Sequence, residues 1–196
     1  MNRILSALSL ALPLALLVGC TDPAKLPAES ALAAAKSAIA TLDAEAQKYA
    51  PDQVSAVKAA FSGAEGLVAK KDYKGALAQL EPIPGKVKEA IAAAAAKKDQ
   101  LVAAWKGATA DLPSLVGALK SRLSILAESK KLPKGLDAAT VASAKEGLAG
   151  IESTFSKATA DFQAGNLEPA IAAVKGLVPK GQEIMKSLGM QVPGAQ

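Results

Sequence analysis

The stretch KYAPDQVSAVKAAFSGAEGLVAKKDYKGALAQLE, Lys48–Glu81, decides the fold that we expect for this chain. A proline pushes the residue before it out of the helical region, so Pro51 ends one helix and opens another. The apolar residues that follow recur every three or four positions, as on one face of an α-helix, at Val54, Val57, Phe61, Ala64 and Val68. Asp72 then interrupts the pattern after two lysines and is a good N-cap for a further helix. The stretch therefore predicts helices joined by a tight turn.

The same spacing continues on both sides of this stretch. The preceding apolar stripe, which predicts one helix, consists of Leu32, Ala35, Ile39, Leu42, Ala46 and Tyr49. Asp111-Leu112-Pro113 starts another helix, and Lys130–Gly135 reads as a loop. No sustained alternation of period two predicts a strand. We therefore expect an all-α protein, an elongated antiparallel helical bundle or paired helical hairpins with five to six helices.

The second half of the sequence repeats the first. Adding 94 to the residue numbers moves the stripe of Val54 and Phe61 onto Leu148 and Phe155, and moves Asp72 onto Asn166, another N-cap type. The pattern predicts an internally duplicated helical hairpin, with the rings of Phe61 and Phe155 buried at equivalent positions. The alternative is chance similarity between alanine-rich helices.

Composition limits the functions that we expect. Hydrophobic residues make up 51% of the chain but aromatic residues only 3%, which predicts a thin, alanine-rich core. The formal net charge of +5 is spread over lysines interspersed with acids, a pattern typical of a solvated surface and not of a nucleic-acid site. Histidine is absent, which removes the usual general base and metal ligand. We expect no enzyme activity, no catalytic residue, no metal and no cofactor.

The N-terminal residues have the pattern of a secretory signal peptide. Arg3 precedes an almost wholly apolar run from Ile4 to Val18, which is short for a membrane-spanning helix. The run ends in Leu17-Val18-Gly19-Cys20, and Cys20 is the only cysteine of the chain. A small buried cysteine behind an uncleaved helix is the alternative to a processed leader.

These four residues resemble the lipobox of bacterial lipoproteins. In that family the cysteine thiol receives a diacylglyceryl group, and cleavage leaves the acylated cysteine as the first residue. The resemblance implies lipidation of Cys20 and a place in the bacterial cell envelope. Thr21 follows the cysteine where an aspartate would imply retention in the inner membrane, so we expect the outer membrane, facing the periplasm.

The hairpin motif also resembles a family of uncharacterised helical periplasmic lipoproteins. Tyr49-Ala50-Pro51 and Asp72-Tyr73 with Ala76-Leu77 match the repeat of that family, whereas the second half lacks the Tyr-Ala-Pro element. The resemblance implies a helical envelope protein and no known activity.

Three amphipathic side chains, Tyr49, Tyr73 and Trp105, are the candidate partner-binding residues. Each lies at or near an apolar helical position, where such a residue is commonly the edge of a core with a satisfied polar tip. The functional alternative is a groove that holds a partner helix or peptide, and Trp105 is the best single candidate because tryptophan is enriched at binding hot spots.

The expected organisation joins these observations. It comprises a lipoprotein signal peptide (1–19), a lipidated tether (20–28), two helical repeats (29–111 and 112–189) and a flexible tail (190–196). We expect a non-catalytic scaffold or adaptor, held to the membrane by its lipid, that contacts an envelope protein or a cell-wall polymer. The alternative is a periplasmic module with a peptide or small-molecule groove between the repeats.

The lipobox yields the first testable prediction. Cys20→Ser removes the sulfur that would be alkylated, so we expect it to abolish labelling by a radioactive fatty acid and to block cleavage before residue 20. Unchanged label in the variant would reject the lipoprotein interpretation.

Overall fold

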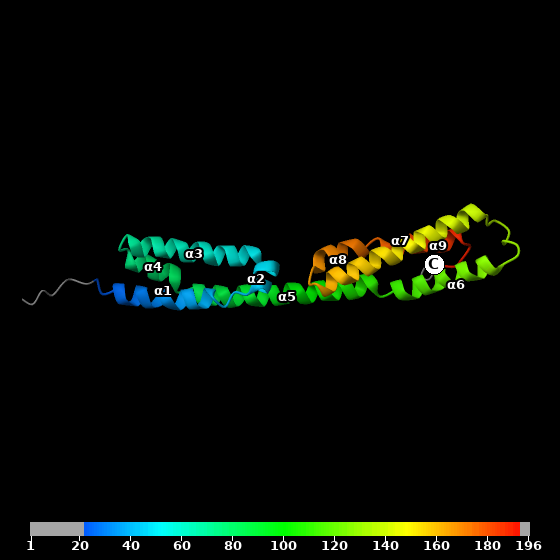
Figure 1. The fold of residues 1–196 in the computed structure, drawn as a ribbon. Coiled ribbons are helices and arrows are strands. Elements are labelled where there is room, and N and C mark those ends of the chain that lie inside the picture. The colour runs from blue at the N-terminus through cyan, green and yellow to red at the C-terminus, as the bar shows by residue number, and fades with distance from the viewer. Residues whose placement is uncertain (1–21, 193–196) are drawn as a thin grey trace, which may run out of the picture. The chain divides into compact units, whose positions relative to one another are not determined.

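The computed structural model describes residues 22–192, and these residues confirm the all-α class (Figure 1). The prediction of five to six helices agrees with the number of helices that have eleven or more residues, which is six among the described residues. These are α1 (Lys25–Ile39), α3 (Pro51–Ala69), α5 (Ile83–Thr109), α6 (Leu112–Glu128), α7 (Ala138–Gln163) and α9 (Leu177–Ser187). Three helices of six to eight residues add to them, namely α2 (Ala44–Tyr49), α4 (Tyr73–Leu80) and α8 (Leu167–Val174).

The described chain divides into two compact units. The first contains residues 22–41 and 55–87, and the second contains residues 42–54 and 88–192. The predicted repeats meet between residues 111 and 112, so the repeats of the sequence and the compact units of the structure divide the chain differently. The repeat boundaries stay a prediction.

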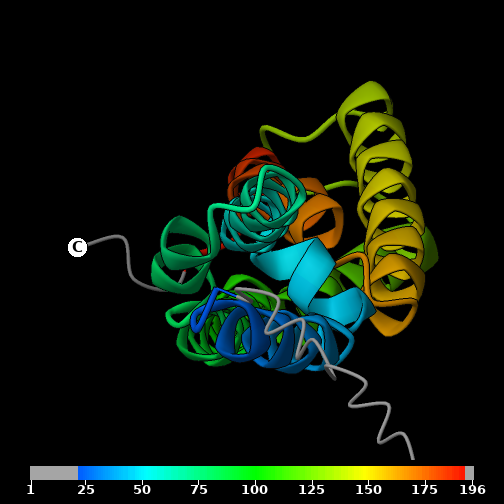
Figure 2. The ribbon, with the colours of Figure 1, turned by 90° about the vertical axis from the view of Figure 1, so that its left-hand side faces the viewer.

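The first unit packs α1 against α4, and both helices begin at the same end of the unit (Figures 1 and 2). Ala28 and Ala35 of α1 and Ala76 of α4 are fully buried, so small side chains occupy the most buried positions of both helices. Helix α1 begins at Lys25, so the predicted tether is wrong in its last four residues. Pro27 is tolerated there, since the first turn of a helix needs no hydrogen bond from its backbone nitrogens.

The predicted single helix before Pro51 is two helices in the structure. Helix α1 ends at Ile39, and Asp43 starts α2 by accepting a hydrogen bond from the backbone N–H of Ala46 at 2.7 Å. The apolar stripe runs across this break and conceals it. Asp137 caps α7 in the same way, accepting from the N–H of Thr140 at 2.7 Å. Hydrogen bonding to the side chain of Thr140, and then to its backbone N–H, lowers the pKa of Asp137.

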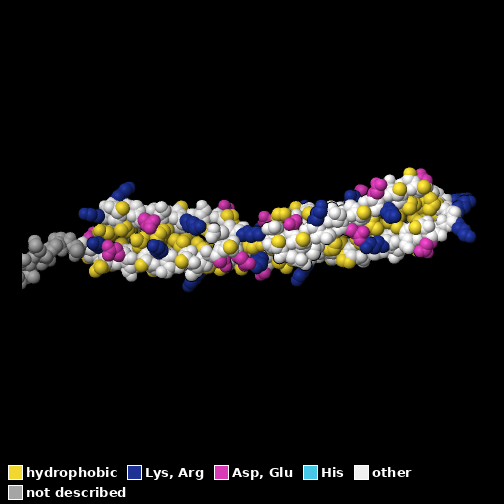
Figure 3. All heavy atoms as spheres, in the orientation of Figure 1, with side chains coloured by type: hydrophobic (Ala, Val, Ile, Leu, Met, Phe, Trp, Pro, Cys, Tyr) yellow, Lys and Arg dark blue, Asp and Glu magenta, His cyan; other side chains and the backbone are white. Residues whose placement is uncertain are grey.

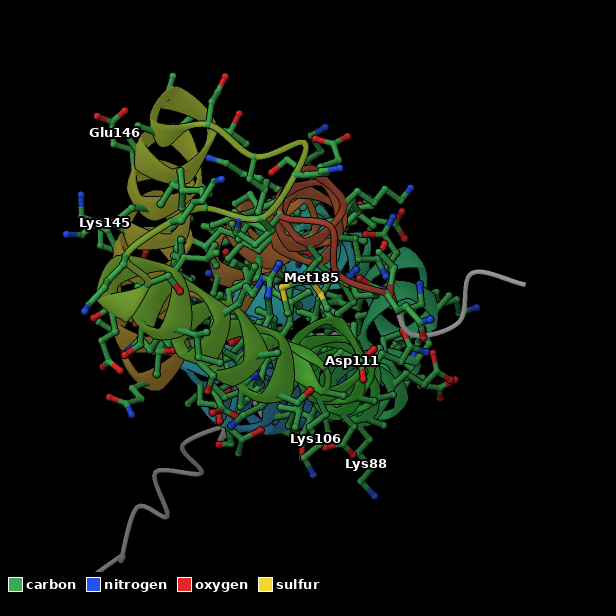
Figure 4. All side chains as sticks on the ribbon, turned by 90° about the vertical axis from the view of Figure 1, so that its right-hand side faces the viewer. Lys88, Lys106, Asp111, Lys145, Glu146 and Met185 are labelled. Carbon is green, nitrogen blue, oxygen red and sulfur yellow. The ribbon has the colours of Figure 1, made fainter. Side chains whose placement is uncertain are left out.

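The second unit packs α7 against α8 and α9, and packs α6 against α9 and α7. One buried cluster joins Leu115, Leu119 and Leu126 of α6 to Leu148 of α7 and Met185 of α9. Figure 4 shows Met185 lying among the helices, whereas Lys145 and Glu146 project away from α7.

The beginning of the predicted tail belongs to this core. Met190 and Val192 pack half-buried against the cluster, and the N–H of Met190 donates to the carbonyl of Met185 at 2.9 Å. The prediction of a flexible tail is therefore wrong for residues 190–192. Residues 193–196 lie outside the described part.

Two turns 94 residues apart have the same hydrogen-bond pattern. The N–H of Asp72 donates to the carbonyl of Leu67 at 2.9 Å, and the N–H of Asn166 donates to that of Asp161 at 2.8 Å. The residue before each has a positive φ, 64° at Lys71 and 82° at Gly165. Glycine accepts this conformation without strain, whereas lysine does not. The geometry of the two turns corresponds, and a duplication of the hairpin stays a prediction.

The aromatic side chains lie at the edges of the cores. Phe61 and Phe155 are both half-buried, as are Trp105, Phe162 and the two tyrosines. The prediction that the two phenylalanine rings are buried is therefore wrong. Alanine occupies many of the most buried positions, for example Ala64 and Ala158, and helices that meet through alanine leave no room for a ring.

The two turns differ in their caps, and this difference generates the second prediction. The Asp72 carboxylate accepts from the N–H of Gly75 at 3.0 Å, whereas Asn166 makes no side-chain cap and instead accepts from Lys48 at 3.3 Å. We expect Asp72→Ala to lower the free energy of unfolding by about 1 kcal/mol, the usual value of a lost N-cap. Asn166→Ala should cost less than about 0.5 kcal/mol.

Urea unfolding followed by far-ultraviolet circular dichroism measures both variants. Equal losses at the two positions would contradict the assignment of the cap to Asp72 alone.

Candidate functional site

Three aromatic rings from two helices form a stack in the second unit. Trp105 of α5 lies 4.6 Å from Phe162 between ring centroids, at an interplanar angle of 17°, and 6.3 Å from Phe155, at 13°. The two phenylalanines are seven residues apart on α7 and therefore lie on one face of it. The stack covers the edge of the cluster formed by Leu112, Ile151, Ala158, Val174 and Leu177.

An open surface between α6 and α7 lies directly beside this stack. It contains one groove of about 450 Å³ and a second of about 490 Å³. Glu152 lines both grooves, and its carboxylate pairs with Lys120 across the two helices at 2.5 Å. We call this surface, which consists of the lining residues of both grooves, the α6–α7 seam.

The two walls of the first groove differ in chemistry. Helix α6 contributes an apolar wall of Leu112, Pro113 and Val116. Helix α7 contributes hydroxyl and amide groups, and it places Phe155 between the groove and Trp105. The polar side chains of this wall are Ser156, Thr159 and Gln163. The groove therefore joins apolar area to a few polar groups, as binding grooves commonly do.

Small side chains make the seam accessible to another helix. Ala127 of α6 and Ala149 and Ala160 of α7 line the two grooves and are exposed. Short side chains at a surface let a second helix axis approach closely. Lys145 lines the second groove and projects outward from α7 (Figure 4), so the seam has a cation at its rim.

Helix α9 packs against the opposite sides of α6 and α7, where a hollow of about 330 Å³ remains between α6 and α9 and one of about 530 Å³ between α7 and α9. A Cβ atom at Gly181 of α9 would lie 2.2 Å from Leu115 of α6, and one at Gly147 of α7 would lie 2.8 Å from Ile184 of α9. Real Cβ atoms essentially never approach other atoms so closely, so an alanine at either position would require the side chain of Leu115 or Ile184 to shift. Helix α9 thus contacts both helices closely, and no residue of α9 lines either groove of the seam.

The hydroxyl of Tyr49 is engaged within the protein. It donates to the carbonyl of Gly165 at 3.0 Å, and Lys48 donates to the same oxygen at 2.8 Å. Glu45, also on α2, pairs with Lys98 of α5, and the hydrogen bond to Glu45 raises the pKa of Lys98. These contacts fasten α2 to the α7–α8 turn and to α5.

The remaining predicted residues lie elsewhere. Tyr73 is half-buried at the start of α4 in the first unit, and neither Tyr73 nor Tyr49 lines either groove of the seam. Trp105 is the one predicted partner-binding residue beside the seam. Phe162 belongs to the apolar stripe that the sequence predicts on this helix, but neither its stacking with Trp105 nor the seam was predicted. Cys20 and the residues Leu17, Val18 and Gly19 lie outside the described residues.

Three findings describe the chemistry of residues 22–192. No polar or charged side chain is buried among them. No group of three or more histidine, cysteine, aspartate or glutamate side chains in this part could hold a metal ion. None of its helices is long and apolar enough to cross a membrane.

Comparison with known proteins gives no relative for this chain, since no protein-family model, no curated protein and no solved structure matches it.

The aromatic stack generates the third prediction. Trp105 is the only tryptophan, so its fluorescence reports on the stack. Phe162→Ala removes the nearer ring and should shift the emission to longer wavelength, increase quenching by acrylamide and cost about 0.5–1.5 kcal/mol of stacking.

Ile125→Ala is the control, because Ile125 is 58% exposed near the other end of α6. An emission spectrum of Phe162→Ala identical to that of the control would contradict the stack.

Proposed function

We propose that the protein is a lipid-anchored, non-catalytic adaptor of the bacterial cell envelope, and that the α6–α7 seam binds an amphipathic helix of a partner protein. The single observation that supports the binding role most strongly is the seam itself. It joins two largely apolar grooves along two helices, and Glu152 lines both of them.

The chemistry of the seam specifies the partner. An apolar stripe at positions spaced three and four apart would fill the two grooves, which is the usual mode of helix-in-groove binding. An acidic side chain of the partner at the rim would pair with Lys145, since Glu152 already pairs with Lys120. The aromatic stack gives the first groove a rigid wall, because the ring of Phe155 is held against Trp105.

The proposed anchor rests on the sequence. The resemblance of Leu17–Cys20 to a lipobox supports acylation of Cys20, behind a leader with the pattern of a signal peptide. Two or three acyl chains hold a protein to a membrane durably. We place the protein at the outer membrane, facing the periplasm, because Thr21 follows the cysteine.

One observation favours a second candidate function. The first groove alone, about 450 Å³ in volume, has hydroxyl and amide groups on its α7 wall. A groove of this size and composition suits a small molecule or a short peptide. The second candidate is therefore a periplasmic binding module that uses only this groove.

The fourth prediction tests the seam. Ala149→Glu/Ala160→Glu places two carboxylates on exposed positions of the seam, so it should leave the helices folded and prevent an apolar helix from docking. Ala172→Glu/Ala173→Glu adds the same charge at exposed positions of α8 and is the matched control. Each chain is crosslinked in intact envelopes, purified, and analysed for partner proteins and for small molecules.

We expect a partner protein with the original chain and with the control, and at least a tenfold loss with the seam variant, corresponding to about 1.4 kcal/mol. Equal capture by all three chains would overturn the seam as the binding surface. Small molecules without a partner protein would favour the binding module. Turnover of peptidoglycan fragments by the purified protein, lost on replacing one acidic residue, would overturn the non-catalytic role.

A further inference from the structure

We infer that one end of the first unit is a docking surface for an anionic phospholipid bilayer, formed by exposed Leu26 and by Lys70, Lys71 and Lys74. The inference deepens the proposed function and rests on its lipid anchor. It adds a contact between the folded protein and the bilayer, so that the membrane would bind both the acyl chains and this surface.

Chain length places this end near the membrane. Only Thr21 separates Cys20 from Asp22, the first described residue, and two residues span about 7 Å at most. The backbone turns into α1 directly, because Asp22 accepts from the N–H of Ala24 at 2.8 Å and its carbonyl accepts from the N–H of Lys25 at 2.9 Å. An acylated Cys20 therefore leaves no long linker between the bilayer and α1.

The α3–α4 turn lies at this same end of the unit. Helices α1 and α4 pack together, and in both views the turn is found beside the beginning of α1 (Figures 1 and 2). Lysine side chains project from this end in Figure 3. A bilayer that meets the start of α1 would therefore also meet the turn.

The end has an exposed apolar side chain. Leu26 is 76% exposed, more than the other large hydrophobic residues that stand out of the described surface, Ile125 at 58% and Ile91 at 38%. It lies in the first turn of α1, close to the proposed anchor. An apolar side chain at this place gains free energy when it enters the interfacial region of a bilayer.

The turn presents cations without a carboxylate partner. Lys70, Lys71 and Lys74 are exposed, and none of them belongs to an ion pair among residues 22–192. Lys71 has a positive φ, and the hydrogen bond from the N–H of Asp72 to the carbonyl of Leu67 holds the turn. The three lysines therefore project from a turn whose backbone is held by hydrogen bonds.

Three of the acidic groups near this end are engaged in local contacts, whereas Glu65 of α3 is exposed and belongs to no ion pair of the described residues. Asp22 and Asp72 each accept a hydrogen bond from a backbone N–H, and Glu29 lies 3.8 Å from Lys25. These acids reduce the local charge but leave the three lysines of the turn able to meet phosphate groups. Each lysine near an anionic bilayer strengthens binding about fivefold.

The chain offers a matched control within itself. Lys130, Lys131 and Lys134 repeat the same spacing in the α6–α7 loop, are equally exposed, and also belong to no ion pair of the described residues. Net charge alone would make both sets bind an anionic membrane. Our inference concerns only the set beside the anchor.

Lysine footprinting of the full, membrane-derived protein tests the inference. The protein is reconstituted into vesicles of phosphatidylcholine, or of phosphatidylcholine and phosphatidylglycerol, and treated with an amine-reactive reagent. Mass spectrometry then gives the labelling rate of each lysine, and the mass of the N-terminal peptide shows whether Cys20 is acylated.

We expect labelling of Lys70, Lys71 and Lys74 to be at least about fivefold slower on the phosphatidylglycerol vesicles, the effect of one lysine, and that of Lys130, Lys131 and Lys134 to be equal on both. The protection should disappear at 1 M salt, where the Debye length is about 3 Å. Leu26→Ser should weaken the protection, whereas Ile125→Ser should not. Equal rates on the two vesicles, or equal protection of both lysine sets, would overturn the inference.

An N-terminal peptide without acyl groups would reject the anchor of the proposed function and leave the surface to a second measurement. In that case the unacylated protein is sedimented with the phosphatidylglycerol vesicles. A loss of binding in K70Q/K71Q/K74Q, but not in K130Q/K131Q/K134Q, would uphold the surface. Equal binding by both variants would overturn it.

Discussion

Close contact between alanine faces is the constraint on which the rest of this structure depends. Fully buried alanines lie on the packed helices of both units, at Ala28, Ala35 and Ala76 in the first and at Ala158 and Ala170 in the second. An alanine adds little apolar area to a core, so each contact gains less free energy than a leucine contact would. The advantage of alanine is that the backbones of two helices can approach each other closely, because no large side chain lies between them. Aromatic rings have no place in such contacts and lie at the edges.

Small residues also shape the second unit, in which α9 packs against one side of α6 and α7 and the seam lies between these two helices. Helix α9 meets α6 and α7 through glycine, at Gly181 and Gly147, and larger side chains such as Met185 fill the space between the helices. On the other side, α6 and α7 are joined by the ion pair of Lys120 and Glu152, and grooves remain on both sides of that pair. An exposed ion pair contributes about 0–1 kcal/mol. The seam can therefore receive a partner without the loss of an interaction on which the fold depends.

The sequence predicted local features well and distant ones poorly. The helical class, the break at Pro51 and the Asp72 cap depend on neighbouring residues and are confirmed. The break between α1 and α2 was not predicted, because the apolar stripe continues through it. The predicted cap at Asn166 is also missing, because the amide oxygen of Asn166 accepts a hydrogen bond from Lys48, which is far away in the chain. Trp105 was predicted as a candidate, but its stacking with Phe155 and Phe162 and the position of the seam depend on how whole helices pack. Periodicity along one helix shows which side is apolar and not which neighbour covers it.

The central claim is that a partner helix occupies the α6–α7 seam, and site-specific photo-crosslinking in intact cells tests it most directly. A photoreactive residue is placed at Ser124 or Ser156, which are exposed and line the two grooves, or at Ser121 or Ser153, which are exposed on the same helices and line neither. The account predicts one adduct of the same mass from Ser124 and from Ser156, and little or none from Ser121 and Ser153. Adducts of equal yield from all four positions, or from the two control positions alone, would contradict it.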